Sequence, residues 1–339
     1  MFLFSLKMED VVLIADSSGL GYSFAKGIYE YLKAKENRSF SVRLCDIEKV
    51  VFKDKEFKVK ICENIRRKKC FLIHDSNKEP CEWFTELIFL LEALRFSSPE
   101  EINVVLPYTK FARQERKESS RVSVNAKALA DIISMYATRG MTVDLHAGQM
   151  QEYFSIPFDN LYSFPSLIGF LKEKHPEILY NLVIVSPDLG GGKRAESLVK
   201  RLRKLGIQSE VAFGHKTRTR DNEVEKIVII GDVKDKNCLI IDDIIDTGNT
   251  LVKTAGALKE KGARNVYAYG THGLFSDGVG KFDVFNKLFV ADTIRNNFAG
   301  NIEIVSLVKL FGEAIYRTIA GESLSAVFDI IDGEQEKLF

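Results

Sequence analysis

Short apolar runs alternate with amphipathic stretches along this chain. The runs at 11–14, 182–186 and 238–241 are typical of strands buried on both sides in a parallel sheet. The stretches at 22–35 and 83–96 instead repeat apolar residues at helical spacing. Strands that alternate with helices in this way predict an α/β fold built on mostly parallel sheets.

The same order of strand, acidic tip, loop and helix recurs in both halves, without enough residue identity for a clear sequence repeat. A chain of 339 residues with 45% hydrophobic content is long enough for two domains. The alternation restarts after 156–163. We therefore expect two tandem domains, each a mostly parallel sheet flanked by helices. The first would comprise 1–165 with 320–339 packed back on it, and the second 166–319.

Composition restricts the partners and the compartment. A formal net charge of +1 gives no overall field for nucleic acid or anionic lipid, so neither is expected as a partner. No uncharged run approaches the roughly 18 residues that cross a bilayer, and the amino terminus lacks the basic leader of a signal peptide. The cysteines are odd in number and form no CxxC pair, which favours reduced packing residues in a cytoplasmic protein.

The most informative stretch is CLIIDDIIDTGNT, residues 238–250. Its apolar start predicts a strand that ends at two carboxylates, at the sheet edge where α/β folds bind ligands. A small, hydroxyl-rich turn and a helix at 251–261 follow, an arrangement that suits a phosphate. Carboxylates and turn together suit a ribose 5-phosphate unit; alternatively, Asp246 and Thr250 only cap the helix. The candidate residues are Asp242, Asp243, Asp246, Thr247, Gly248, Asn249 and Thr250.

Polar residues follow several other predicted strands. A basic segment after the strand at 102–108 contains planar donors that suit phosphate. The strand at 141–146 ends on Asp144 and His146, where a histidine can be structural or can bind metal or phosphate. Asp188 precedes a Gly-rich turn into a helix. Residues 215–226 combine basic residues with almost no apolar anchor, which predicts a mobile cationic loop.

Taken in order, these segments resemble the successive blocks of the ribose-phosphate pyrophosphokinase family. The resemblance runs from about residue 104 to 328 and rests on PYTKFARQERKESSR, DLHAGQMQEYF, IPFDNLYS, VSPDLGGGKRAESLVKRL, HKTRTRDNEVEK, IIGDVKDKNCLIIDDIIDTGNT, THGLFSDG and RTIAGESLSAVF. The stretch 238–250 is also similar to the motif of phosphoribosyltransferases. The ARQ block, the DLHAxQ block and the loop with Lys and Arg two positions apart resemble the pyrophosphokinases alone.

The resemblance implies two phosphoribosyltransferase-type domains, with ATP bound between them and across a subunit contact, in a homo-oligomer based on dimers and often hexameric. The implied reaction transfers the β,γ-diphosphoryl group of ATP to the anomeric hydroxyl of ribose 5-phosphate, with Mg2+ as cofactor. The implied catalytic pair is Lys216 and Arg218, and the metal-site positions are His146 and Asp188. The implied ATP-binding residues are Phe52, Asp54, Glu56, Arg113, Gln114 and His146.

The first hundred residues depart from the family pattern. The nucleotide-contacting loop usually reads FSDGE, whereas FKDKE here places Lys53 and Lys55 at small-residue positions. The nucleotide preference and any regulation by phosphate or ADP therefore stay open, and the loop could also be an ordinary hairpin tip. Two other activities remain at this stage: a phosphoribosyltransferase that consumes phosphoribosyl pyrophosphate, and a non-catalytic regulatory member of the family.

Overall fold

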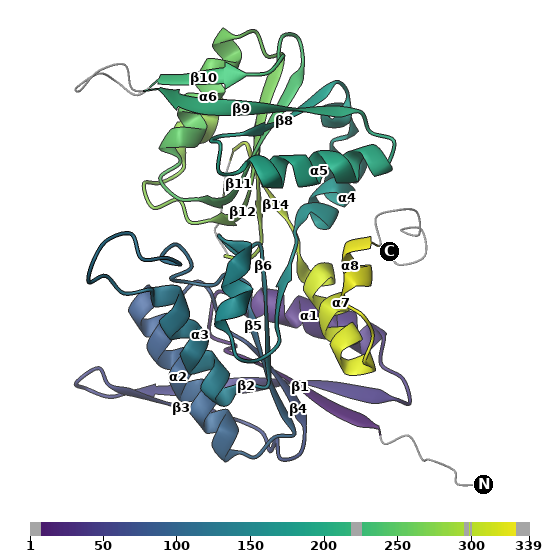
Figure 1. The fold of residues 1–339 in the computed structure, drawn as a ribbon. Helices are drawn as coiled ribbons and strands as arrows, with labels where there is room; N and C mark the ends of the chain where they lie inside the picture. The colour runs from purple at the N-terminus through teal and green to yellow at the C-terminus, as the bar shows by residue number, and fades with distance from the viewer. Residues whose placement is uncertain (1–7, 218–225, 295–297, 299, 330–339) are drawn as a thin grey trace. The chain divides into compact units, whose positions relative to one another are not determined.

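The computed structural model describes residues 8–217, 226–294, 298 and 300–329, and these form two compact units (Figure 1). The first contains the described residues of Met1–Tyr162, Thr293–Arg295 and Val308–Val327. The second contains those of Ser163–Asp292, Asn296–Leu307 and Phe328–Phe339.

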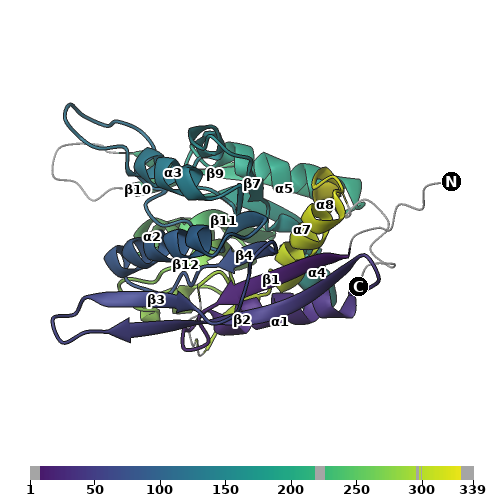
Figure 2. The ribbon, with the colours of Figure 1, turned by 90° about the horizontal axis from the view of Figure 1, so that it is seen from below.

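A sheet of seven strands forms the centre of the first unit. Its strands are β1 (Glu9–Ala15), β2 (Phe40–Val51), β3 (Phe57–Ile61), β4 (Lys69–Ile73), β5 (Glu101–Leu106), β6 (Arg139–Val143) and β7 (Phe158–Leu161). They are ordered β3-β2-β1-β4-β5-β6-β7, and all neighbours are parallel except β2 and β3. Those two strands form a long hairpin at the edge of the unit (Figure 2).

Helices pack on this sheet through apolar stripes. The helices of the unit are α1 (Tyr22–Ala34), α2 (Pro80–Phe96), α3 (Asn125–Tyr136), α7 (Val308–Ala320) and the 3-10 helix η1 (Gly148–Tyr153). On α2, Leu87, Leu90 and Leu94 recur at helical spacing and are fully buried. They pack with α3 and with alternate residues of the central strands, including Val12 and Ile14. Meanwhile α1 packs against α7.

The second unit repeats this topology. Its strands are β8 (Leu182–Ser186), β9 (Ser209–Thr217), β10 (Lys226–Ile230), β11 (Asn237–Ile245), β12 (Asn265–Gly273), β13 (Lys287–Ala291) and β14 (Ile302–Val305). They are ordered β10-β9-β8-β11-β12-β13-β14, with β9 and β10 as the antiparallel pair. The strand order therefore matches that of the first unit position by position, which makes the units structural repeats of each other.

Apolar layers cover both faces of the second sheet. The helices of this unit are α4 (Phe164–Lys174), α5 (Gly192–Lys204), α6 (Asn249–Glu260) and the 3-10 helices η2 (Pro176–Leu179) and η3 (Gly280–Val284). The short helix α8 (Ser325–Asp329) begins in the first unit, which extends to Val327. One core cluster joins α6 to the sheet through Leu251, Ala255 and Leu258. The other joins α4 and α5 to the opposite strand faces, for example through Ile168 and Leu198.

The predicted fold class, two mostly parallel sheets flanked by helices, is confirmed. The prediction of a loop from 215 was wrong, because β9 continues to Thr217 and β10 begins at Lys226. The strand expected at 141–146 ends at Val143, so Asp144 and His146 follow it. The structure also groups α7 with the first unit, whereas the sequence placed residues up to 319 in the second domain.

Two further sequence expectations concern the cysteines and membranes. All five cysteines are unpaired, but only Cys45, Cys70 and Cys238 are buried packing residues. The expectation was wrong for Cys62 and Cys81, which are exposed. In the part of the chain that the structure describes, no helix is both long enough and apolar enough to cross a membrane.

Each sheet has one point where the strand order reverses. In the first unit this point lies between β1 and β4, and in the second between β8 and β11. In open α/β sheets, ligands bind outside the carboxyl ends of the strands at such a reversal. The loops that follow these four strands are therefore the expected positions of a ligand site.

Candidate functional site

The reversal point of the second unit carries the adjacent carboxylates Asp242 and Asp243. They do not end their strand as predicted, because β11 continues to Ile245. Successive side chains of a strand point to opposite faces, so the two carboxylates differ in environment. The side chain of Asp243 is 6% exposed, whereas that of Asp242 is 32% exposed. In the ligand-free site the Asp243 carboxylate is therefore nearly buried, and the Asp242 carboxylate is only partly accessible.

Arg194 on α5 joins this pair, and sequence reasoning missed it. Its guanidinium donates to the Asp243 carboxylate at 2.8 Å and lies 3.6 Å from the Asp242 carboxylate. A cation in the first turn of a helix opposes the helix dipole, so such a residue costs stability unless it has a partner. That unfavourable placement, directly after the Gly-rich turn, was the sequence signal available for Arg194.

The two carboxylates influence each other's charge. Burial and the adjacent Asp243 carboxylate raise the pKa of Asp242 to about 8, and the Arg194 guanidinium offsets only part of this rise. Keeping both carboxylates ionised therefore costs free energy in the ligand-free site. Hydroxyl groups that donate hydrogen bonds to the pair would stabilise its ionised form.

The turn after β11 leads directly into α6. Gly248 has φ of 69°, and a Cβ at this position would lie 2.3 Å from the Phe282 ring, so both backbone and space require glycine. Gly248 is also the N-cap of α6. The alternative in which Asp246 or Thr250 is the N-cap is therefore wrong. With no side chain at the N-cap, the first N–H groups of α6 and its dipole favour an anion here.

The other residues of the turn are held from the side. The Asp246 carboxylate accepts a hydrogen bond from the Ser276 hydroxyl, and the Asn249 side-chain oxygen accepts one from the Lys281 ammonium at 3.2 Å. Thr247 and Asn249 are exposed. The structure thus places the seven predicted residues in one continuous segment, at the end of β11 and the start of α6.

Asp188 lies on the neighbouring loop of the same reversal point, between β8 and α5. Its carboxylate accepts a hydrogen bond from the Gly191 N–H at 2.9 Å, and its carbonyl accepts one from the Ser186 hydroxyl at 2.6 Å. These bonds fix the loop while the residue stays exposed. An exposed, oriented carboxylate oxygen is a suitable ligand for a hydrated Mg2+ ion.

The cationic pair predicted for catalysis belongs to the β9–β10 hairpin. The backbone of Lys216 pairs with Ile227, which places it near the end of β9; its side chain is not among the described features. Arg218 lies outside the described residues. The structure therefore places Lys216 near the end of β9, next to the edge strand β10, and leaves the role of both cations as a prediction.

The predicted nucleotide-contacting residues lie in the first unit, at the tip of the β2–β3 hairpin. The Phe52 N–H donates to the Glu56 carbonyl at 2.7 Å, and the Asp54 carboxylate accepts from the Glu56 N–H at 3.1 Å. Lys55 adopts φ of 72°, as tight turns require. Phe52 remains 48% exposed, so its ring is accessible to a ligand.

The remaining predicted ATP residues follow β5 and β6 in the same unit. Arg113 and His146 are exposed, and Gln114 accepts a hydrogen bond from the Asn125 amide at the start of α3. Asp144, next to the end of β6, has φ of 42°. No group of three or more His, Cys, Asp or Glu side chains within the described residues is arranged to hold a metal ion. Mg2+ commonly needs only one or two carboxylates together with substrate phosphates.

Comparison with known proteins adds independent findings. Residues 21–136 match the family model of the N-terminal domain of ribose phosphate pyrophosphokinase, and residues 215–329 match that of the phosphoribosyl synthetase-associated domain. The chain is 41% identical over 335 residues to a ribose-phosphate pyrophosphokinase of Bradyrhizobium diazoefficiens, covering 96% of this chain and all of the relative. It is 42% identical over 286 residues to that of Brucella melitensis, covering 82% and 90% of the two chains.

A solved structure is similar over nearly the whole length. The crystal structure of phosphoribosylpyrophosphate synthetase from Mycobacterium smegmatis superposes with a TM-score of 0.78 at 25% identity. The superposition covers 92% of this chain and 99% of that one. Sequence and fold therefore point to the same group of proteins.

Proposed function

The chain belongs to the ribose-phosphate pyrophosphokinase family, and from that premise we propose which of its residues carry out the reaction. It is an enzyme of nucleotide biosynthesis that transfers the β,γ-diphosphoryl group of ATP to the anomeric hydroxyl of ribose 5-phosphate, giving 5-phosphoribosyl 1-pyrophosphate and AMP. The observation that carries this conclusion is identity of 41% along the full length of a named relative.

The ribose 5-phosphate site is the segment from Asp242 to Thr250. The carboxylates of Asp242 and Asp243 accept hydrogen bonds from the sugar hydroxyls, while the turn and the N-terminus of α6 bind the 5-phosphate. The partly accessible Asp242 carboxylate, the Gly248 N-cap and the positive end of the helix dipole support this assignment. Arg194 holds the Asp243 carboxylate in place.

The ATP residues are Phe52, Asp54, Glu56, Arg113, Gln114 and His146. The ordered turn with an exposed Phe52 ring is suited to stacking on a flat base, and its two carboxylates to hydrogen bonding with the base or sugar. The exposed guanidinium of Arg113 is suited to a phosphate. We assign the ATP side of the reaction to the first unit on this basis, and the ribose side to the second.

Transfer of the diphosphoryl group needs charge neutralised on oxygen atoms and an acceptor held in line. Lys216 and Arg218 provide that charge from the β9–β10 hairpin, while the segment from Asp242 to Thr250 orients the anomeric hydroxyl. The protein does little covalent work in such a reaction. Its contribution is the position of the donors relative to the phosphates.

The reaction is metal-dependent, as phosphoryl transfer in this family is, and we propose Mg2+ as the ion. The exposed carboxylate of Asp188 would contact the ion or its water, and His146 would contact it or the ATP phosphates. Mg2+ would neutralise phosphate charge.

Replacing both residues, as His146→Ala with Asp188→Ala, should raise the Mg2+ concentration at half-maximal rate several-fold. The rate is measured as AMP formation over a series of Mg2+ concentrations. As a matched control, His175→Ala removes a histidine that is engaged with Glu303 at 2.7 Å inside the second unit. If the double variant keeps the wild-type Mg2+ dependence, His146 is only a surface histidine and Asp188 only orders its loop.

One incubation tests the activity itself. With ATP, ribose 5-phosphate and Mg2+, the chain should form equal amounts of AMP and phosphoribosyl pyrophosphate, which chromatography separates. A phosphoribosyltransferase would instead consume phosphoribosyl pyrophosphate with a nucleobase and have no need for ATP. A non-catalytic regulatory member would form no AMP, and that outcome would contradict the proposal.

We further propose that the enzyme is a cytoplasmic homo-oligomer built from dimers, with a hexamer among its forms. The unpaired state of all five cysteines supports a reducing compartment. Large apolar side chains on the helices of the first unit remain exposed, among them Phe96 at 75% and Met135 at 72%. Exposed apolar surface of this kind supports contact with another copy.

A further inference from the structure

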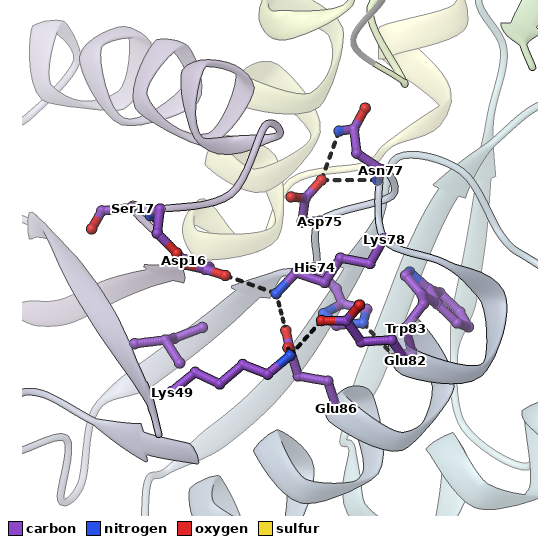
Figure 3. A network of polar contacts seen from close by, with 12 residues as sticks. Asp16, Ser17, Lys49, His74, Asp75, Asn77, Lys78, Glu82, Trp83 and Glu86 are labelled. Carbon is purple, nitrogen blue, oxygen red and sulfur yellow. Dashed lines mark hydrogen bonds and ion pairs between the residues drawn. The ribbon is translucent and has the colours of Figure 1, made fainter. Parts of the chain in front are cut away.

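Five charged side chains form a connected network at the reversal point of the first unit (Figure 3). They come from the loop after β1, the loop after β4, helix α2 and strand β2. The residues are Asp16, Lys49, Lys78, Glu82 and Glu86. In the second unit the corresponding point carries the proposed ribose site, whereas here the side chains satisfy one another.

Glu86 is the centre of this network. Its side chain is 2% exposed, and each of its oxygens accepts from a different lysine. One accepts from Lys78, whose ammonium also lies 2.7 Å from the Asp16 carboxylate. The other accepts from Lys49 at 2.8 Å. Removing either lysine would therefore leave a buried carboxylate short of a counter-ion.

Such a network is poorly explained by stability alone. Taking ionised groups out of water costs free energy, and the attraction between the buried charges often does no more than offset that cost. Apolar residues of similar size at the same positions commonly stabilise a fold as much as the ion pairs do. What ion pairs of fixed geometry provide is a defined position for the elements they join. Glu86 is therefore expected to fix the position of an element that it contacts.

That element is the β2–β3 hairpin, because Lys49 lies on β2 just before the tip of this hairpin. Its ammonium also contacts the Glu82 carboxylate at 2.5 Å and lies over the Phe57 ring at 4.2 Å from the centroid. The Phe57 ring in turn packs against the Phe89 ring of α2 at 5.4 Å. Both strands are thus fastened to α2 at the base of the turn that contains Phe52.

We propose that Lys49 and Glu86 are positioning residues that hold the Phe52–Glu56 turn in the orientation needed to receive the adenine of ATP. We call Lys49 and Glu86 the clamp, and Lys78 links it to the loop after β1 through Asp16. The proposal rests on the proposed function in one respect, the assignment of the turn to the nucleotide. The clamp itself is independent of that assignment.

The test compares Lys49→Met, which keeps side-chain length but removes the charge, with the wild type. We expect KM for ATP to rise about tenfold, because misplacing a binding element by about 1 Å can cost up to about 10²-fold. The kcat and the KM for ribose 5-phosphate should stay within about twofold. Lys49→Arg, which keeps the charge, should restore most of the ATP affinity.

Lys60→Met is the matched control. Lys60 lies on β3 of the same hairpin and pairs with Glu48 at 3.0 Å, but both side chains are more than half exposed. An exposed pair contributes little, so KM for ATP should not change. If Lys49→Met behaves like Lys60→Met in the steady-state assay, the positioning role is wrong.

Two further measurements separate the clamp from the nucleotide assignment. Hydrogen exchange of the Phe52 and Lys55 amides, which bond within the turn, should become faster in Lys49→Met and not in Lys60→Met. Phe52→Ala should raise KM for ATP on its own. An unchanged KM in Phe52→Ala would overturn the nucleotide assignment and the adenine role of the clamp together, while unchanged exchange would overturn the clamp alone.

Discussion

Lys216→Ala and Arg218→Ala should each lower kcat by about 10²–10³-fold while KM for ATP and the melting temperature stay near wild type. In the proposed mechanism the two cations would reach the diphosphoryl group as its charge shifts, so their interaction would be stronger in the transition state than with bound substrate. Lys216 lies near the end of β9, the strand next to the edge strand β10, and the segment 215–226 has few apolar residues. Replacing one of its cations is therefore expected to leave the folding free energy nearly unchanged.

Lys236→Ala provides the control for these variants. Lys236 immediately precedes β11, and its ammonium contacts Glu210 near the start of β9 at 2.8 Å. This variant therefore removes a cation from the same unit, at the opposite end of β9 from Lys216. Single-turnover and steady-state kinetics should show normal kcat for this variant. A Lys216→Ala enzyme that retained kcat but bound ATP poorly would make the hairpin a binding element and contradict its catalytic role.

Elements with strong local patterns could be predicted from the sequence. The apolar run of β8 and the leucines at helical spacing on α2 were identified because burial on both faces, or on one stripe, leaves a clear record in residue order. The segment at Asp242–Thr250 was identified because strand, turn and helix signals are adjacent there. Its glycine at φ 69° is required by local backbone geometry.

The missed features depend on neighbours that are distant in sequence. Arg194 and Asp243 are 49 positions apart, and Lys49 meets Glu86 across 37 positions, so no window of sequence contains either pair. The end of β9 was read as loop because His215, Lys216 and Thr217 are polar. The backbone of these residues pairs with β10, so the strand continues here without an apolar pattern.

The two units share one topology but differ in the side chains at the carboxyl ends of their strands. At the reversal point of the second unit, the Asp242 carboxylate stays partly accessible, and the N-terminus of α6 follows it in the chain. At that of the first unit, Lys78 neutralises both Asp16 and Glu86, and the carboxylate of Asp75 lies against Gly19 and Gly21. The first edge is therefore filled by its own side chains, and its unit contributes through the neighbouring hairpin instead.

Asp243→Asn should raise the Kd of ribose 5-phosphate by about 10–10²-fold, the cost of losing hydrogen bonds to a charged acceptor. Asp242→Asn should act in the same direction. ATP affinity should stay near wild type in both variants, because the proposed adenine contacts lie on other segments. Each variant should fold, because Arg194 lies near both carboxylates and keeps the unchanged one as its partner.

Isothermal calorimetry with each substrate separately would measure these effects, and Asp232→Asn is the control. Asp232 precedes the amino end of β11 and pairs with Lys236 at 3.1 Å, with a side chain that is 71% exposed. Neutralising it changes the net charge of the chain by the same amount without altering the ligand edge, so ribose 5-phosphate affinity should be unchanged. If Asp243→Asn lost ATP affinity and kept that for ribose 5-phosphate, the segment after β11 would have to be reassigned to the nucleotide.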